Sequence, residues 1–329
     1  MKRFLKVLCA VKMTHAAARQ KLRGVYRYVA EGHDWDIRLI REEHGLTGKT
    51  IRQAAADTDG FLISIPSATE ALSALSRVRA PVAAIECDHP FLARRKHPTV
   101  LLGTDNAAIG RMAATYFHSL GRFGSFAFIH DASRSYWSED RRKGFFSALK
   151  GDRAVEFAGT AQGLRSFERW LAHAPHPIAA FCAWDTTAID VLTRVRHVGL
   201  SVPEQVSVMG VDDDECLCDT ANPPLTSIRV NREQQGYDAA AMLGRMMEGP
   251  CRIKTRQILC KPLRIVERKS TRSLTPARFL VDRALLFIAS HACEGITPNS
   301  VALELGVSRR LLDLRFRDLH AGTIQDNIT

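Results

Sequence analysis

The sequence predicts an α/β protein built on parallel β-sheets and followed by a smaller all-α segment. Short apolar runs alternate with segments whose apolar residues recur at helical spacing, which is typical of a parallel sheet. From Thr271 onward the composition changes and the periodicity is helical. With 329 residues and 46% hydrophobic content, the chain is long enough to bury the cores of two or three domains or lobes.

The alternation starts with a strand at Leu5–Val11 and a helix at about 16–30. Further strands are expected at 36–40, 60–65 and 81–87, with a helix at 68–78. The loops after these strands carry His15 and Glu86, and parallel strands bring such loops to one edge of the sheet. We expect His15 to line that edge or lie at the surface, because the sequence offers no nucleophile that could be paired with it.

Targeting signals are not expected. Lys6 and Lys12 interrupt the N-terminal apolar run, so it predicts a strand and not a signal peptide. No stretch approaches the ~18 apolar residues of a membrane span. The eight cysteines are scattered without zinc-site spacing, which favours reduced thiols. These features predict a cytoplasmic protein without metal or cofactor.

The net charge of +11 favours a polyanionic partner such as DNA. The excess lies mainly in residues 1–270, since residues 271–329 contain seven Lys and Arg and six Asp and Glu. Solvated surface of a large α/β domain explains such an excess equally well, so charge alone does not establish DNA binding.

The central unit of the chain is a strand at 178–183, a helix at 186–198 and a strand at 206–210. The residues that follow its two strands are Trp184-Asp185 and Asp212-Asp213, and they should face the same crevice. Carboxylates accept hydrogen bonds from hydroxyls and an aromatic ring covers the C–H face of a sugar, so the pattern suits a polyhydroxylated ligand. The alternative is that the aspartates are helix caps or turn residues.

Three segments carry a family resemblance. They are Asp185 with Ala188, the run GLSVPEQVSVMGVDD at 199–213, and PPLTSI at 223–228. Their order and spacing resemble the effector-binding core of LacI/GalR-type repressors, which implies a type I periplasmic-binding-protein fold of two Rossmann-like lobes. In that family the DNA-binding helices precede the core, whereas here Leu5–Val11 is already the first core strand. A DNA-binding part is therefore expected elsewhere.

The same resemblance implies further effector contacts. Asp105 opens a helix on the first lobe's side of the cleft, and simple N-capping by Asp105 or Asn106 is the alternative. Arg141 stands three residues before Gly144, the offset at which the family places a sugar-binding arginine, and a guanidinium can donate a fork of hydrogen bonds to neighbouring hydroxyls. The alternative is that Arg141, Arg142 and Lys143 form a solvated helix face. Trp137, in the loop before it, is expected at the same site.

The resemblance also implies that each lobe is discontinuous. The first lobe is expected to comprise 1–122 with 226–249, and the second 123–225 with 250–270. Crossovers near Gly121, Leu225 and Gly249 would form a hinge that closes the lobes around a ligand.

Residues 271–329 predict a helix that ends at His291 and two short helical segments within 296–319. The positions that fit helix–turn–helix spacing are Ala302, Gly306, Val307, Ser308 and Leu312. Ser308 would cap the second helix, leaving Arg309, Arg310 and Arg315 to reach bases or phosphates. A structural helical hairpin is the alternative.

The continuation Leu314-x-Phe316 up to Gly322 resembles the first helix–turn–helix of an AraC/XylS-type domain. That family has two such units, and this chain reaches only the first before Thr329. We therefore expect a partial DNA-binding domain at 271–329, which would bind DNA weakly because its phosphate contacts are roughly halved.

These features predict a sugar-responsive, DNA-binding transcription regulator that acts as a homodimer. Pentoses such as xylose are candidate effectors, and RNA polymerase is a candidate partner. The alternatives are a sugar sensor without productive DNA binding and a transport-type binding protein, although an export signal is not apparent. An enzyme using Asp212 and Asp213 is not expected, because sequence neighbours rarely provide the ~5–9 Å separation of opposed carboxylates.

Overall fold

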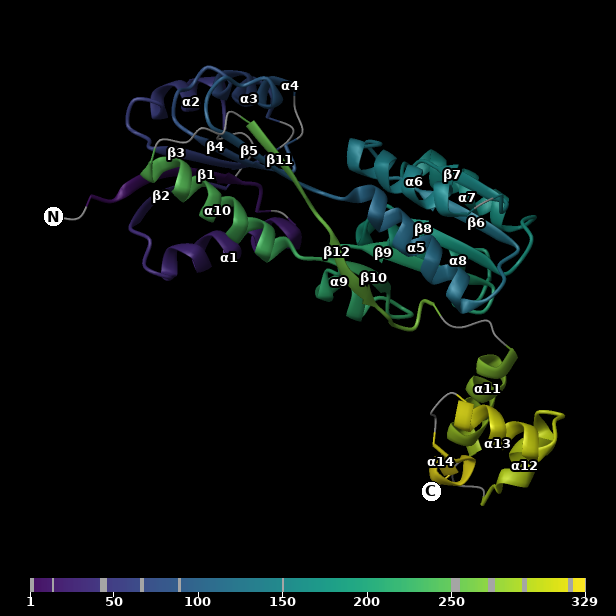
Figure 1. The fold of residues 1–329 in the computed structure, drawn as a ribbon. Helices are drawn as coiled ribbons and strands as arrows, with labels where there is room; N and C mark the ends of the chain where they lie inside the picture. Colours follow the sequence, from purple (N-terminus) through teal and green to yellow (C-terminus); the bar gives the residue numbers. More distant parts are fainter. Residues whose placement is uncertain are drawn as a thin grey trace.

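The computed structural model describes residues 3–13, 15–41, 46–65, 68–87, 90–149, 151–249, 255–271, 276–291, 295–318 and 322–328. Two six-stranded sheets, each covered by helices on both faces, form two lobes. A group of C-terminal helices follows the second lobe (Figure 1). This arrangement confirms the predicted α/β architecture with parallel sheets.

The sheet of the first lobe is parallel throughout, in the order β11-β5-β4-β3-β1-β2. Its inner strands are continuous apolar runs because helices bury both faces. The strands are β1 (Leu5–Val11), β2 (Trp35–Ile40), β3 (Gly60–Ser64), β4 (Val82–Ile85), β5 (Thr99–Thr104) and β11 (Thr255–Cys260). One face carries α1 (Ala16–Ala30) and α10 (Arg232–Glu248), and the other α2 (Gly48–Ala54), α3 (Thr69–Leu75) and α4 (Pro90–Ala93).

The sheet of the second lobe has the order β12-β10-β9-β8-β6-β7, with only β12 antiparallel among the described strands. The strands are β6 (Ser125–Ile129), β7 (Ala154–Phe157), β8 (Ile178–Cys182), β9 (Val206–Val211), β10 (Thr226–Val230) and β12 (Pro262–Val266). One face carries α5 (Asn106–Leu120) and α6 (Tyr136–Ala148), and the other α7 (Ala161–Leu171), α8 (Asp185–His197) and α9 (Glu215–Thr220).

The chain crosses between the lobes at Asp105, Asn231 and Lys261. The first and third crossovers are joined, because the Asp105 amide donates to the carbonyl of Cys260 at 2.9 Å. Figure 1 shows the third as the ribbon that runs from β11 in one lobe to β12 in the other. These three short connections form the hinge.

The expected lobe boundaries, with crossovers near Gly121, Leu225 and Gly249, are therefore wrong. The helix α5 belongs to the second lobe because it packs backbone to backbone on α6: a Cβ added at Gly144 would lie 2.1 Å from the carbonyl oxygen of Ala107. The strand β10 also belongs there, since it pairs with β9. The range 250–270, expected in the second lobe, is split between the lobes, because β11 extends the first lobe's sheet beside β5 and β12 closes the second lobe's sheet.

The C-terminal helices share a small apolar core of their own. They are α11 (Pro276–His291), α12 (Pro298–Glu304), α13 (Arg309–Asp318) and α14 (Ile324–Ile328). Gly306 has a φ of 66° in the turn before α13, and the Ser308 hydroxyl accepts a hydrogen bond from the Leu311 amide at 3.2 Å. Ala302 and Leu312 are buried, as the spacing predicts. No helix in the described part of the chain is long and apolar enough to cross a membrane.

Candidate functional site

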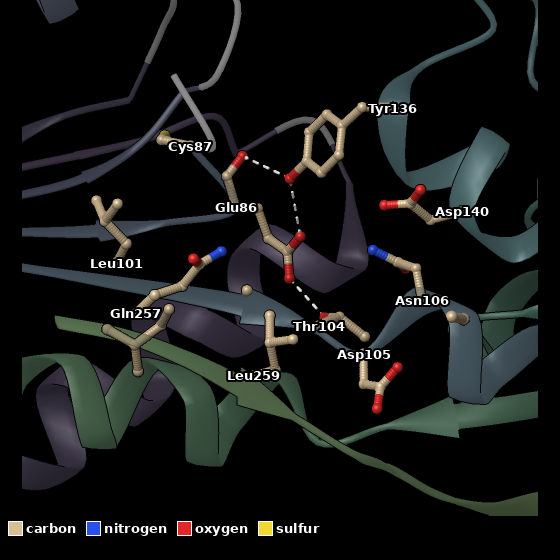
Figure 2. Close-up of a pocket in the computed structure, with 13 residues that line it drawn as sticks. Glu86, Cys87, Leu101, Thr104, Asp105, Asn106, Tyr136, Asp140, Gln257 and Leu259 are labelled. Carbon is tan, nitrogen blue, oxygen red and sulfur yellow. Dashed lines mark hydrogen bonds between the residues drawn. The ribbon is translucent and has the colours of Figure 1, made fainter. Parts of the chain in front are cut away.

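The carboxyl ends of both parallel sheets face a cleft between the lobes. Two described pairs of side chains meet across it. The ring of His15, before α1, lies edge-on to that of Trp184, before α8, with centroids 5.6 Å apart. The hydroxyl of Tyr136 donates to the carbonyl and carboxylate oxygens of Glu86, each at 3.4 Å (Figure 2). The lobes are thus in contact along this cleft.

One arginine at the hinge joins the two lobes. Arg232 begins α10 directly after a crossover, and its guanidinium donates to Glu86 of the first lobe at 2.9 Å and to Asp212 of the second at 2.8 Å. We call Glu86, Arg232 and Asp212 the interlobe latch. Arg232 is only 5% exposed, and its Nε has no hydrogen-bond partner among the described atoms. The latch therefore contains one buried N–H group, at Arg232 Nε, that can still donate a hydrogen bond.

The latch keeps its carboxylates ionised. Burial acts to raise the pKa of Asp212, but Arg232 and Arg141 outweigh it and lower that pKa to about 2. Burial likewise opposes ionisation of Glu86, and Arg232 and Lys21 lower its pKa to about 2. Burial would lower the pKa of Arg232, but the two carboxylates raise it. All three groups are charged at neutral pH.

Further polar groups surround Glu86 on the floor of the first lobe. Thr104 and Gln235 donate to its carboxylate at 2.5 and 2.9 Å (the Thr104 contact is drawn in Figure 2). Lys21 donates to Ser64 at 3.2 Å, and burial, reinforced by Arg232, lowers the pKa of Lys21 to about 8. These contacts hold the Glu86 carboxylate in one orientation toward the cleft.

The wall formed by the second lobe is aromatic and cationic. The rings of Trp137 and Trp184 lie 6.1 Å apart, and the guanidinium of Arg141 stacks 4.8 Å above the Trp137 ring. Arg141 is 2% exposed and donates to the Asn106 side chain at 3.0 Å and to the carbonyl of Ala183. These bonds fix Arg141 and, through it, the plane of Trp137.

Two small hollows open on this cleft. The larger, of about 180 Å³, is bordered by Glu86, Asp105 and Tyr136 among others (Figure 2). The smaller, of about 40 Å³, is bordered by His15, Trp184, Asp185 and Asp212 among others. Arg232 bonds Glu86 of one hollow and Asp212 of the other, so the latch separates them. Each hollow is smaller than the ~300 Å³ at which ordinary ligand pockets begin.

The structure places Trp137, Arg141, Trp184 and Asp212 close together at the cleft, and that they contact an effector stays a prediction. Asp105 lies at the larger hollow and also caps α5, because its carboxylate accepts a hydrogen bond from the Ala108 amide at 2.8 Å. Capping and an effector contact thus remain compatible for Asp105.

Asp185 borders the smaller hollow, but its carboxylate is engaged within the second lobe. Its two oxygens accept hydrogen bonds from the Ser227 hydroxyl at 2.6 Å and the Asp214 amide at 2.9 Å. The residue is 3% exposed, and burial raises the pKa of Asp185 to about 7. In this conformation its carboxylate connects α8 to the strands β9 and β10.

Asp213 does not face the cleft, contrary to the expectation that it contacts an effector. Its side chain is fully buried and forms ion pairs with Arg229 and with Arg268, the latter at 2.8 Å. Asp212 and Asp213 follow the end of β9 with positive φ angles, and in this turn Asp212 reaches Arg232 in the cleft whereas Asp213 reaches Arg229 and Arg268.

Sequence reasoning missed Arg232, Lys21 and Gln235 as cleft residues. Lys21 and Gln235 lie on helical faces that also bury small residues, so they do not stand out from the periodicity. The signal for Arg232 was its position directly after the apolar strand β10, where parallel strands deliver functional side chains.

The arginines predicted to contact DNA lie on α13. Arg309 and Arg310 are exposed, whereas Arg315 is half-buried. Arg317 is also exposed and was not singled out. Ser308 caps this helix as expected.

Comparisons with known proteins agree with this architecture. Residues 114–271 match the family described as periplasmic binding protein-like domain. The xylose operon regulatory protein of Escherichia coli (strain K12) is 28% identical over 321 residues, covering 93% of this chain and 79% of that protein. The protein of the same name from Haemophilus influenzae is 25% identical over 324 residues, covering 94% of this chain and 81% of that one.

Among solved structures, that of a xylose-binding transcription activator superposes with a TM-score of 0.69 at 26% identity, covering 99% of this chain and 85% of that chain. A LacI family regulator from Enterococcus faecium with bound ribose has a TM-score of 0.63 at 19% identity, covering 82% of this chain and 100% of that chain, and supports the fold alone. The chain is thus similar to transcription regulators, and part of it matches a periplasmic-binding-protein-like domain.

Proposed function

We propose that this protein is a transcription regulator in which a monosaccharide binds between the lobes and controls DNA binding by the C-terminal helices. The observation that carries the proposal is the interlobe latch beside an aromatic wall. Arg232 bonds both lobes and retains an unpartnered buried Nε donor among the described atoms. A ligand rich in hydroxyls can accept from that donor and also bond the carboxylates that Arg232 now holds.

The effector class follows from the side chains of the cleft. Trp137 and Trp184 are neighbouring rings that suit the C–H surface of a sugar, and Arg141 stacks on Trp137 and donates to the Asn106 side chain. We infer that Asp212 and Glu86 accept from sugar hydroxyls, and that Asp105 contacts the ligand from the larger hollow. A pentose is our first candidate, because the relatives named above are xylose operon regulators.

Binding must rearrange the latch. A ligand that bonds Asp212 and Arg232 must displace part of the contact that these two groups now make with each other. We infer that the effector inserts between Arg232 and Asp212 and rotates the lobes about the hinge at Asp105, Asn231 and Lys261. The effector can shift this equilibrium only by its differential affinity for the two lobe arrangements.

The DNA-binding part of the proposal concerns α12 and α13 as a helix–turn–helix of AraC/XylS type. Ser308 caps α13, and Arg309, Arg310 and Arg315 are its proposed contacts to bases or phosphates. In a homodimer, lobe rotation would change the spacing of the two DNA-binding segments. RNA polymerase is a proposed further partner at the promoter.

The test is titration of this chain with DNA from its own upstream region over a range of salt concentrations, with and without D-xylose, L-arabinose and D-ribose. Specific DNA binding that one pentose changes would support the proposal. Sugar binding without specific DNA binding would instead support a sensor that does not engage DNA productively. Binding of neither DNA nor sugar would contradict the proposed function.

A further inference from the structure

The segment that leads to the C-terminal helices is bound to the second lobe by buried contacts. The amide of Ser270 donates to the Pro224 carbonyl at 2.9 Å, and its hydroxyl donates to the Val208 carbonyl at 2.6 Å. The Thr271 hydroxyl contacts those of Thr226 and Tyr116, each at 2.9 Å. We call residues 268–271 the exit segment. It is held against β9 and β10 and precedes α11, which begins at Pro276.

Arg268 anchors the start of the exit segment. Its guanidinium donates to Asp213 at 2.8 Å, to Asp219 at 2.6 Å and to the Leu225 carbonyl at 3.0 Å. Its amide donates to the Thr226 hydroxyl at 2.8 Å. Because the Asp213 side chain is fully buried, the pair is shielded from solvent and from screening by salt.

Asp212 and Asp213 are adjacent in sequence, but they bind arginines in two different parts of the protein. Asp212 holds Arg232 in the cleft, and Asp213 holds Arg268 of the exit segment. Both residues have positive φ angles, 102° for Asp212 and 54° for Asp213. Such angles are costly for residues with a side chain, by about 1–3 kcal/mol each, and persist only where surrounding contacts enforce them. Their ion pairs are among those contacts, together with hydrogen bonds from the Asp212 amide to the Ile228 carbonyl and from the Asp213 amide to the Ser227 hydroxyl, each at 3.0 Å.

We propose that the turn Asp212-Asp213 transmits the state of the cleft to the exit segment, with Arg268 as the positioning residue that receives it. This inference rests on the proposed function for its physiological meaning, but its physical content does not require sugar or DNA. Release of Asp212 from Arg232 removes one of the contacts that enforce the turn. The turn then relaxes, Asp213 shifts, and the exit segment loses its fixed position before α11.

Amide hydrogen exchange of the full chain tests this directly. In Asp212→Asn, we expect the amides of Arg268 and Ser270 to exchange at least ~10-fold faster than in the wild type, because exchange reports local opening. The matched control is Asp140→Asn, which removes a carboxylate from the border of the larger hollow but not from the turn. In Asp140→Asn, the exit segment should keep its wild-type exchange rates.

A second pair of variants separates transmission from simple unfolding. In an Arg268→Met background, Asp212→Asn should accelerate exchange of the Ser270 amide no further, whereas in an Arg264→Met background, which alters an exposed arginine of β12, it should still do so. If Asp212→Asn alters exchange only near Arg232, the proposal is overturned. Equal acceleration of every second-lobe amide, including that of Phe181 in β8, would also overturn it, because global opening would explain the effect.

These outcomes are independent of the test of the proposed function. A chain that binds no pentose and no DNA would contradict that function while leaving the exchange result unaffected. Where a pentose does change DNA affinity, Arg268→Met should keep the pentose affinity within about twofold and reduce the pentose-dependent change in DNA affinity at least ~5-fold. An unchanged pentose effect on DNA binding in this variant would overturn the proposal.

Discussion

The interlobe latch makes a quantitative prediction for Asp212→Asn. The folded chain lowers the pKa of Asp212 from 3.8 to about 2, although burial alone would raise it. A difference of one pKa unit corresponds to about 1.4 kcal/mol, so ionised Asp212 stabilises the folded state by about 2 kcal/mol at neutral pH. Replacing it by asparagine removes this contribution and leaves Arg232 with Glu86 as its remaining carboxylate partner in the latch.

The sign of the pH dependence follows from the lowered pKa. An acid with a depressed pKa in the folded state contributes fully above its unfolded pKa of about 4 and loses that contribution as the pH falls through about 2. At pH 3 the difference between wild type and Asp212→Asn should therefore shrink to roughly half of its value at pH 7. Residual stability at low pH then comes from the apolar cores of the lobes.

The assay is urea unfolding of both proteins at pH 7 and pH 3, followed by tryptophan fluorescence and far-UV circular dichroism. Comparable m-values and coincident transitions are required before the free energies of unfolding are compared, because two lobes can unfold separately. Asp140→Asn is the control, and its half-exposed, weakly paired carboxylate should change the free energy by less than ~0.5 kcal/mol. The prediction is refuted if Asp212→Asn lowers the free energy of unfolding by less than ~0.5 kcal/mol at pH 7. It is also refuted if the decrease at pH 3 is as large as the decrease at pH 7.

Three further predictions concern the helix crossing, the aromatic wall and the C-terminal helices. Gly144→Ala should destabilise the second lobe by at least ~2 kcal/mol in the same urea assay, because the new methyl would lie 2.1 Å from a backbone oxygen, whereas Gly249→Ala, with open space around it, should not. Trp184→Phe should abolish most of any sugar-induced change in tryptophan fluorescence, whereas Trp170→Phe, on the outer face of the second lobe, should preserve it. Arg310→Ala should weaken DNA binding and reduce the slope of log affinity against log salt by about one, measured by fluorescence anisotropy, whereas a variant with an unchanged slope would show that Arg310 contacts no phosphate.

Much of the fold could be predicted from local patterns. The strand Leu5–Val11 was predicted with the bounds that the structure shows. It is a largely buried parallel strand, and its apolar run from Val7 to Val11 differs from any helical periodicity. The start of the helix Asn106–Leu120 was also located correctly, because Asp105 caps it. The lobe to which this helix belongs was not predicted correctly, because it depends on which other helix α5 packs against.

That packing is decided by a few small residues. Gly144 and Gly110 allow α5 and α6 to touch through their backbones, and each would bring an added Cβ within about 2 Å of the opposite helix. A single glycine in a helical pattern is compatible with many roles, so neither residue predicts its partner. The positions of the crossovers follow from this packing of α5 on α6, and the order of the elements along the chain does not predict them.

The candidate site shows the same limit at the level of single side chains. Asp185, Asp212 and Asp213 are the same residue type, yet they have three different environments. Asp185 is buried with a pKa raised to about 7, Asp212 binds the interlobe arginine Arg232, and Asp213 faces away from the cleft. What separates them is the partner each finds across the sheet, which for Asp212 is a residue after the next strand. The sequence could predict that acidic side chains lie near the cleft, but it could not predict which partner each of them binds.

The latch also sets a condition on the proposed effector. The charged neighbours of Asp212, chiefly Arg232 and Arg141, contribute about 2 kcal/mol to its ionised state, which corresponds to a roughly 30-fold loss of affinity for a ligand that disrupts these contacts without replacing them. A hydroxyl that bonds only one lobe leaves the other charge buried without a partner, and such groups cost several kcal/mol. A ligand with hydroxyls on two sides can satisfy Asp212 and Arg232 at once. The latch therefore favours polyhydroxylated ligands over apolar ones of equal size, and a deoxy-pentose should bind more weakly than its parent sugar by about the cost of one unpaired charge.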